Sequence, residues 1–317
     1  MSARDVVRPE MPPLLVIAGA TATGKSGLAI AAAQVLRDEG IPAEIISADS
    51  RQVYRGMDIA TAKVPVGERR GVPHHGLDLA EPDEAFSVVD FVRHARGALA
   101  TIAANGGVAI LVGGTGLYLR AIARGLDAEA LPFDATVRAG IEAGITADGL
   151  APAVTRLTAI APRLASRIDL ANPRRVARAL EIAELRGDMV RPAPTGYAGP
   201  VAWVGLRLAP DVHRSWIDRR SREQFESRLI EEARALRERF DPSLPSFSAI
   251  GYREAWAMID GEQTRDAATE LVATRTLQFA KRQATWFRSE PDIEWHDAAA
   301  DDLSAIARRA ALAIAGR

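Results

Sequence analysis

Residues 14–26 read Leu-Leu-Val-Ile-Ala-Gly-Ala-Thr-Ala-Thr-Gly-Lys-Ser, and they give the strongest indication of the fold. The first five of these residues form a short apolar run, which is typical of a buried strand in a parallel sheet. The residues that follow match G-x-x-x-x-G-K-[ST], and the chain continues from Gly27 with helical spacing. The sequence therefore predicts a phosphate-binding loop between a strand and a helix. A glycine-rich turn that only joins the two elements is the alternative.

The loop has a definite chemistry, because its backbone N–H groups and the helix N-terminus converge on one anion. Lys25 is expected to neutralise phosphate charge, and the Ser26 hydroxyl to bind a magnesium ion. A diphosphate or a longer polyphosphate is the expected ligand. The residues predicted to hold it are Gly19, Ala20, Thr21, Ala22, Thr23, Gly24, Lys25 and Ser26.

Composition excludes several classes of protein. The 317 residues contain no cysteine, which excludes disulfides, thiolate zinc sites and a cysteine nucleophile. No apolar run reaches the length of a membrane span, and residues 1–12 contain no apolar core of signal-peptide length. We therefore expect a cytoplasmic, monomeric protein that makes no membrane contact. The net charge of −1 argues neither for nor against nucleic acid, so that a basic footprint must be local.

Two further strands are expected to end beside the loop, because ligands bind at the carboxyl ends of the strands in open α/β sheets. The strand 44–48 leads into Asp49. The strand 108–112 leads into Gly-Gly-Thr-Gly at 113–116, where a P-loop ATPase usually has a magnesium-binding aspartate. Asp49 is thus the only acid in such a place. These residues alone leave it open whether Asp49 is a magnesium ligand or a general base.

The chain predicts an α/β fold, a P-loop NTPase-like parallel sheet flanked by helices, with an all-helical insertion domain. The first part of the core covers residues 13–125, the insertion 126–199 and the completion of the core 200–317. In the insertion, prolines separate alanine- and arginine-rich helical segments, and Asn172-Pro173 is typical of a helix start. After the insertion we expect a strand at 201–206 and one long helix over 211–240.

The last long helix is basic over residues 271–288, where acids are absent and Arg275, Lys281, Arg282 and Arg288 recur. Trp286 and Phe287 lie among these cations. Such a pattern fits a groove that follows phosphates and stacks bases. It equally fits an amphipathic helix whose aromatic residues pack into the core.

With these residues in place, the chain resembles the tRNA dimethylallyltransferase family over nearly its whole length. The matching stretches are residues 19–26, Ser-Ala-Asp-Ser-Arg-Gln-Val-Tyr-Arg-Gly-Met-Asp at 47–58, Thr-Ala-Lys at 61–63, Val-Gly-Gly-Thr-Gly-Leu-Tyr at 112–118, Arg-Val-Ala-Arg-Ala-Leu-Glu at 175–181, Ile-Gly-Tyr-Arg-Glu at 250–254 and Ala-Lys-Arg-Gln-Ala-Thr-Trp-Phe-Arg at 280–288. A phosphate loop alone is shared by many functions, but these motifs in this order are specific.

The resemblance implies transfer of a dimethylallyl group from dimethylallyl diphosphate to the exocyclic amine of the adenosine 3′ to the anticodon. It implies that Asp49 is the general base and that Thr21 contacts the acceptor, while Lys25 and magnesium stabilise the departing diphosphate. The residues it places along the anticodon stem-loop of tRNA are Asp49, Ser50, Arg51, Gln52, Thr115, Arg138, Asn172, Arg174, Arg175, Gly251, Tyr252, Arg253, Lys281, Arg282, Gln283, Trp286 and Arg288.

One departure affects the diphosphate site. The family usually has an arginine where this chain has Trp216, so that Arg220 or Arg219 is expected to contact the diphosphate instead. Three alternatives remain: a P-loop small-molecule kinase that binds ATP, an isopentenyltransferase that acts on free adenine nucleotides, and a non-catalytic RNA-binding protein. The released product, diphosphate or ADP, distinguishes the first from a transferase.

Overall fold

The computed structural model describes residues 11–189 and 192–317. The sequence predicts no signal peptide in residues 1–12. Residues 1–10 lie outside the described part of the chain, so the structure does not test this prediction. The chain divides into two compact units, the first within Met1–Gly125 and Gly196–Arg317 and the second Leu126–Thr195. Each is described here by itself.

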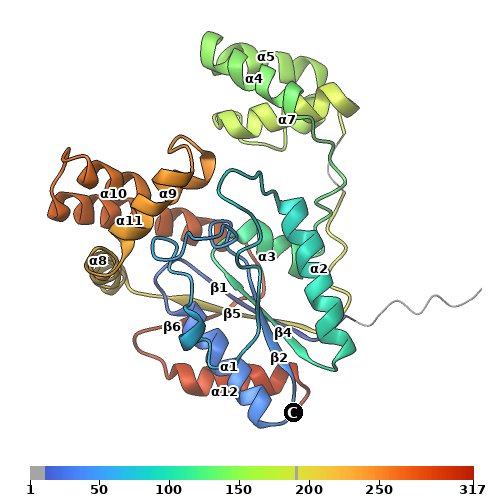
Figure 1. The fold of residues 1–317 in the computed structure, drawn as a ribbon. Helices are drawn as coiled ribbons and strands as arrows, with labels where there is room; N and C mark the ends of the chain where they lie inside the picture. The colour runs from blue at the N-terminus through green and yellow to red at the C-terminus, as the bar shows by residue number, and fades with distance from the viewer. Residues whose placement is uncertain (1–10, 190–191) are drawn as a thin grey trace, which may run out of the picture. The chain divides into compact units, whose positions relative to one another are not determined.

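The first unit contains a six-stranded parallel sheet in the order β3-β2-β4-β1-β5-β6 (Figure 1). The strands are β1 (Leu14–Gly19), β2 (Ala43–Ser47), β3 (His74–His75), β4 (Val108–Gly113), β5 (Val201–Arg207) and β6 (Glu294–Asp297). This confirms the predicted fold class. The strand β6 was not predicted from the sequence.

Helices cover both faces of the sheet because its central strands are apolar on both sides. On one face, Leu15 and Ile17 of β1 pack with α1 (Lys25–Asp38) and α12 (Leu303–Ile314), which lie side by side (Figure 1). On the other lie α2 (Val88–Ala104) and α3 (Gly116–Ala123), joined by stacking of Phe91 on Tyr118 with ring centroids 4.1 Å apart. Ser87 caps the start of α2 and forms a capping box with Asp90.

The C-terminal helices form a second core beside the sheet. They are α8 (Pro210–Glu226), α9 (Leu229–Arg239), α10 (Tyr252–Ile259) and α11 (Arg265–Phe287), with short 3₁₀ turns at Val66–Glu68 and Pro245–Ser248 elsewhere in the unit. Phe225, Leu229 and Tyr252 pack there with Val53 and Met57 of the loop after β2. This packing attaches that loop to the C-terminal helices.

The prediction of one helix over 211–240 is wrong. The chain leaves helical geometry at Ser227, whose ψ is −137°, and resumes as α9 at Leu229. The Ser227 hydroxyl donates to the Gln224 carbonyl, which the interrupted helix leaves without a backbone donor. The break allows α9 to follow a new direction and to pack against α10.

The second unit is all-helical, with α4 (Ala135–Asp148), α5 (Leu150–Ile160), α6 (Pro162–Ala165) and α7 (Pro173–Arg186). Asn172 caps α7 as predicted, since its side chain accepts from the N–H groups of Arg174 and Arg175. Glu181 is fully buried and is bound by Arg178 and Arg138. Burial raises the pKa of Glu181, but the hydrogen bonds from Arg178, the Asp134 N–H and Arg138 outweigh it and lower the pKa overall.

In the described part of the chain, no helix combines the length and the apolar character needed to cross a bilayer.

Two glycines allow a test of how closely β4 approaches the residue after β2: Gly113 lies at this contact, and Gly97 serves as the control. A Cβ on Gly113 would lie 2.1 Å from the Ala48 carbonyl oxygen, where β4 meets the end of β2. Gly113→Ala should therefore lower the free energy of unfolding by about 1–3 kcal/mol, as overpacked cores do. Gly97→Ala, in α2 with no atom within 4 Å of the added Cβ, should raise it by roughly 0.5–1 kcal/mol. Urea unfolding measures both, and equal effects would contradict the close approach.

Candidate active site

The phosphate loop takes the form that its glycines permit. Gly19 has φ of 144° at the end of β1, and a Cβ there would lie 2.4 Å from the Leu206 carbonyl oxygen. Gly24 has φ of 84° and is the N-cap of α1. The Thr23 hydroxyl donates to the Ala20 carbonyl at 2.9 Å, which closes the loop on itself. The loop therefore wraps around the N-terminus of α1, and helix N-termini are favourable sites for anions.

Lys25 lies inside this loop. Its ammonium group donates to the Ala20 carbonyl. Burial lowers the pKa of Lys25 from its usual 10.5 to about 7, while Asp49 raises it and Arg220 lowers it. A buried cation with one carbonyl partner lacks the counter-ion that it needs. Lys25 is thus prepared for an anionic ligand.

A cavity of about 360 Å³ opens in front of the loop. Its wall brings together the phosphate loop, the ends of β2 and β4, the loop after β2, and the helices α8 and α11. The lining residues are Thr21, Ala22, Thr23, Gly24, Lys25, Ser26, Gly27, Ser47, Asp49, Gln52, Thr61, Ala62, Val112, Gly113, Gly114, Trp216, Arg219, Arg220, Glu223 and Gln283. The predicted loop, Asp49 and the arginines of α8 therefore share one cavity.

Asp49 lies two residues after the end of β2, and one of its carboxylate oxygens accepts hydrogen bonds. Its Oδ1 accepts from the N–H groups of Arg51 at 2.8 Å and Gln52 at 3.4 Å. Among the described residues, its Oδ2 accepts no hydrogen bond and forms no ion pair. One oxygen thus holds the turn, while the other is free for a ligand.

Of the two arginines expected to replace the usual one, Arg220 contacts the loop. Its guanidinium donates to the Thr21 hydroxyl at 2.9 Å. Arg219 is exposed, lies 5.8 Å from the centre of the Trp216 ring and pairs with Glu223 at 3.7 Å. Trp216 presents its ring to the same cavity, so Arg220 is the better-placed cation for a ligand at the loop.

The loop after β2 is held beside the cavity by the partly buried polar side chains of Glu232 and Gln52, whose contacts with the backbone were not predicted from the sequence. Glu232 of α9 accepts from the backbone N–H groups of residues 58–60 and from the Tyr252 hydroxyl. Gln52 accepts from Ser47 and donates to the carbonyl of Thr61 at 3.0 Å. Such contacts cannot be predicted from the sequence, because the partners are backbone N–H and carbonyl groups, which every residue has.

The residues predicted to line a tRNA path differ in exposure. In the first unit, Arg253, Lys281, Arg282 and Arg288 are exposed. Arg51 donates to the carbonyls of Pro245 and Ser246 and to the Ser248 hydroxyl. Ser50 and Thr115 are hydrogen-bonded to each other. In the second unit, Arg174 and Arg175 are exposed, whereas Arg138 pairs with Glu181.

Three of the residues predicted to contact tRNA have side chains that pack against other parts of the protein. Tyr252 is fully buried in the second core, next to the buried Gly251. Gln283 is 6% exposed. Trp286 is half-buried and packs on Gly116 beneath Arg120, with the guanidinium 4.5 Å from the ring centre. Tyr252 and Gln283 are thus buried by protein contacts, whereas Trp286 keeps part of its surface exposed.

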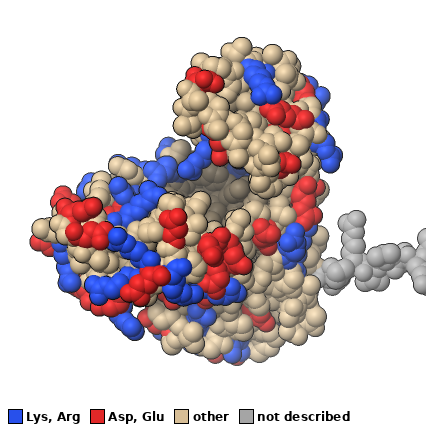
Figure 2. Space-filling view, turned by 45° about the horizontal axis from the view of Figure 1, so that its top comes forward, with Lys and Arg blue, Asp and Glu red and all other residues tan. Residues whose placement is uncertain are grey.

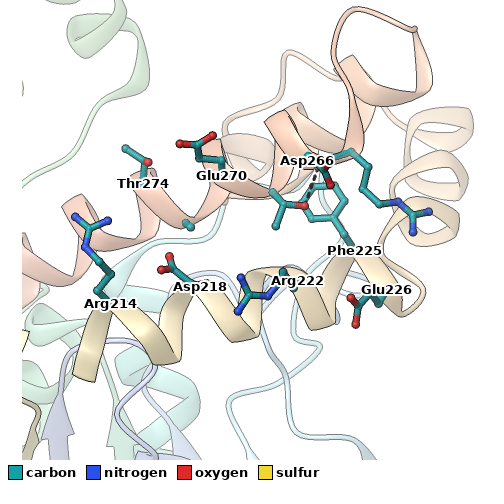
Figure 3. Close-up of a pocket in the computed structure, with 11 residues that line it drawn as sticks. Arg214, Asp218, Arg222, Phe225, Glu226, Asp266, Glu270 and Thr274 are labelled. Atoms are coloured by element: carbon teal, nitrogen blue, oxygen red, sulfur yellow. Dashed lines mark hydrogen bonds between the residues drawn. The ribbon is translucent and has the colours of Figure 1, made fainter. Parts of the chain in front are cut away.

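A second groove, of about 410 Å³, lies between α8 and α11 (Figure 3). Arg214, Asp218 and Arg222 extend from α8 toward Glu270 and Asp266 of α11, so charges of both signs alternate along it (Figure 3). Figure 2 shows the same mixture of Lys and Arg with Asp and Glu over this side of the first unit. The phosphate loop and Asp49 line the other cavity, and we assign the candidate active site there.

The chain is similar to several known proteins. A sequence model of the family described as IPP transferase matches residues 52–290. The tRNA dimethylallyltransferase of Leptothrix cholodnii is 41% identical over 302 residues, covering 92% of either chain. That of Geobacillus kaustophilus is 40% identical over 286 residues, covering 89% of either chain.

Solved structures of similar proteins share the fold. The full-length tRNA isopentenylpyrophosphate transferase of Bacillus halodurans has a TM-score of 0.69 at 36% identity, covering 96% of this chain and 95% of its own. A eukaryotic dimethylallyltransferase acting on tRNA has a TM-score of 0.74 at 26% identity, covering 96% of this chain and 79% of its own.

The position of Arg220 predicts a specific loss of anion binding. Arg220→Ala should weaken binding of magnesium pyrophosphate by about 1.5–3 kcal/mol, roughly 10- to 150-fold, because a charge-assisted partner is removed. Arg222→Ala, on the same helix but in the other groove, is the matched control and should stay within about twofold of wild type. Isothermal titration calorimetry measures both. Equal effects would mean that only the overall charge of α8 matters.

Proposed function

This chain belongs to the IPP transferase family, and from that premise we propose that it transfers a dimethylallyl group from dimethylallyl diphosphate to tRNA. The acceptor is the exocyclic amine of the adenosine 3′ to the anticodon. The observation that supports this reaction most directly is the shared cavity, which has Lys25 and Arg220 beside the carboxylate of Asp49. The cations that would hold the leaving diphosphate and the carboxylate that would accept a proton therefore line the same cavity.

The donor end of the cavity suits a diphosphate. The loop N–H groups, Lys25 and Arg220 oppose the negative charge that grows on diphosphate as the allylic carbon–oxygen bond breaks. The electron pair of that bond leaves with the diphosphate. At the end of β4 the chain has Gly113 and Gly114 where an ATPase has an acid, which supports a leaving diphosphate over a hydrolysed ATP.

The acceptor end suits an adenine amine. This nitrogen is a weak nucleophile and becomes acidic as it bonds to the allylic carbon, so a carboxylate can take its proton. Asp49 has one free oxygen for this purpose. Thr21 accepts a hydrogen bond from Arg220, which leaves its own hydroxyl hydrogen available to the acceptor. An adenosine in an anticodon loop must be unstacked to enter.

Magnesium fits the residues at the donor end. The Ser26 side chain is exposed at the loop and, among the described residues, makes no hydrogen bond. Magnesium keeps several waters and binds one or two protein oxygens together with substrate phosphates, so Ser26 with the diphosphate would hold it. When bound, the ion would neutralise diphosphate charge. The described residues contain no cluster of three His, Asp or Glu side chains that would bind a metal by itself.

Mass spectrometry of unmodified tRNA, incubated with dimethylallyl diphosphate and magnesium, tests the function. We expect a gain of one dimethylallyl group on one anticodon-loop adenosine, with release of diphosphate. Transfer to free AMP but not to tRNA would favour an enzyme acting on free nucleotides. Sustained release of ADP from ATP would indicate a kinase.

The role of Asp49 is tested by Asp49→Asn, which keeps the Oδ1 that holds the turn and removes the basic oxygen. Turnover should fall by about 10²–10⁴-fold, while the tRNA dissociation constant stays near that of wild type. Recovery of turnover at high magnesium would instead identify Asp49 as a metal ligand.

The exposed cations of α11 are tested by the salt dependence of tRNA binding. Lys281→Ala and Arg282→Ala should weaken tRNA binding, and each should flatten the slope of log affinity against log salt by about 0.7–0.9. Arg265→Ala, at the other end of the helix, is the control and should leave the slope unchanged. Slopes equal to wild type in the first two variants would show that this end of α11 makes no phosphate contact.

A further inference from the structure

Gln283 joins two loops of the active site through a single side chain. Its Oε1 accepts from the Thr21 N–H at 2.8 Å, and its Nε2 donates to the Gly114 carbonyl at 2.9 Å. A backbone N–H can only donate and a carbonyl can only accept, so these partners fix which way the amide points. The side chain is 6% exposed, and both ends of its amide are engaged.

The connection continues beyond Gly114 to the loop that carries Asp49. The next residue, Thr115, accepts from the Ser50 N–H at 3.0 Å and donates its own N–H to the Ala48 carbonyl at 3.2 Å. Ser50 and Ala48 flank Asp49 in the chain. A continuous path therefore runs from the phosphate loop through Gln283 and the β4 loop to the backbone on either side of Asp49.

The Thr21 end of this path is firmly held. Besides Gln283, Arg220 donates to its hydroxyl at 2.9 Å and His213 donates to its carbonyl at 2.8 Å. Every polar atom of Thr21 thus has a side-chain partner from α8 or α11. Moving Gln283 would release the one bond that ties this residue to the β4 loop.

The contact with Gly114 is close as well as polar. A Cβ on Gly114 would lie 2.2 Å from the Gln283 Nε2, whereas its φ is not in the left-handed region. An alanine there would therefore displace the amide without straining the backbone. The bridge can be broken from either side.

We propose that Gln283 is a positioning residue that sets the separation between the phosphate loop and Asp49, an inference that rests on the proposed function. The loop holds the leaving diphosphate and Asp49 takes the amine proton, so both must reach the substrates in one geometry. A misplacement of about 1 Å between such groups can cost roughly 100-fold in rate. The role differs from the tRNA contact that the sequence predicts for this residue.

The test compares Gln283→Met, which keeps the volume and removes both hydrogen bonds, with Gln278→Met, an exposed glutamine on the same helix. Single-turnover transfer is measured at saturating dimethylallyl diphosphate and tRNA, together with the tRNA dissociation constant and the melting temperature. For Gln283→Met we expect the rate to fall about 10- to 100-fold, with tRNA affinity within about twofold of wild type. Gln278→Met should match wild type.

Gly114→Ala breaks the bridge from the other side and covers the case in which Gln283→Met folds poorly. We expect a similar loss of rate, and the double variant should lose no more than either single variant, because both remove one shared contact. Additive losses, an unchanged rate, or weaker tRNA binding at an unchanged rate would overturn the proposal. A loss of rate that only follows a loss of folded protein would also overturn it. Wild-type transfer in the same assay tests the proposed function separately.

Discussion

The close approach of backbone segments at the carboxyl edge of the sheet is the constraint on which the rest of the active site depends. Gly19 lies against the Leu206 carbonyl, Gly113 against that of Ala48, and Gly114 against the Gln283 amide. A side chain at any of these positions would occupy space already filled by a neighbour. Because β1 lies between β4 and β5, with β2 beyond β4, these approaches bring the loops after β1, β2 and β4 to one cavity. The chemistry of the site follows from that convergence.

Charge in this cavity is only partly compensated. Lys25 is buried with a carbonyl as its hydrogen-bond partner, Arg220 is bound to a neutral hydroxyl, and Asp49 uses one oxygen on backbone N–H groups. Buried charges normally pair with one another. Here the two cations remain available to an anionic donor and the carboxylate to a proton. Burial lowers the pKa of Lys25 by more than the nearby carboxylate of Asp49 raises it.

The charged side chains of the helical unit are used differently. Arg138 and Arg178 both contact the buried Glu181, and Arg178 also donates to the Pro132 carbonyl. These bonds attach α4 and the segment before it to α7, so two arginines of an arginine-rich sequence serve packing. Arg174 and Arg175 stay exposed at the start of α7, where they are free to meet phosphates. The sequence pattern alone does not separate these two uses.

Features that depend on neighbours along the chain could be predicted from the amino-acid pattern. The phosphate loop between β1 and α1, the strand before Asp49, the missing acid after β4 and the helix start at Asn172 are all local patterns of period, cap or motif. The break at Ser227, the strand β6 and the burial of Tyr252 depend on packing between distant segments. So do the contacts of Glu232 and Gln283 with backbone groups far away in the chain. The physical reason is that a polar or aromatic side chain has the same sequence pattern whether it faces solvent or a carbonyl. Its role depends on which segment packs against it.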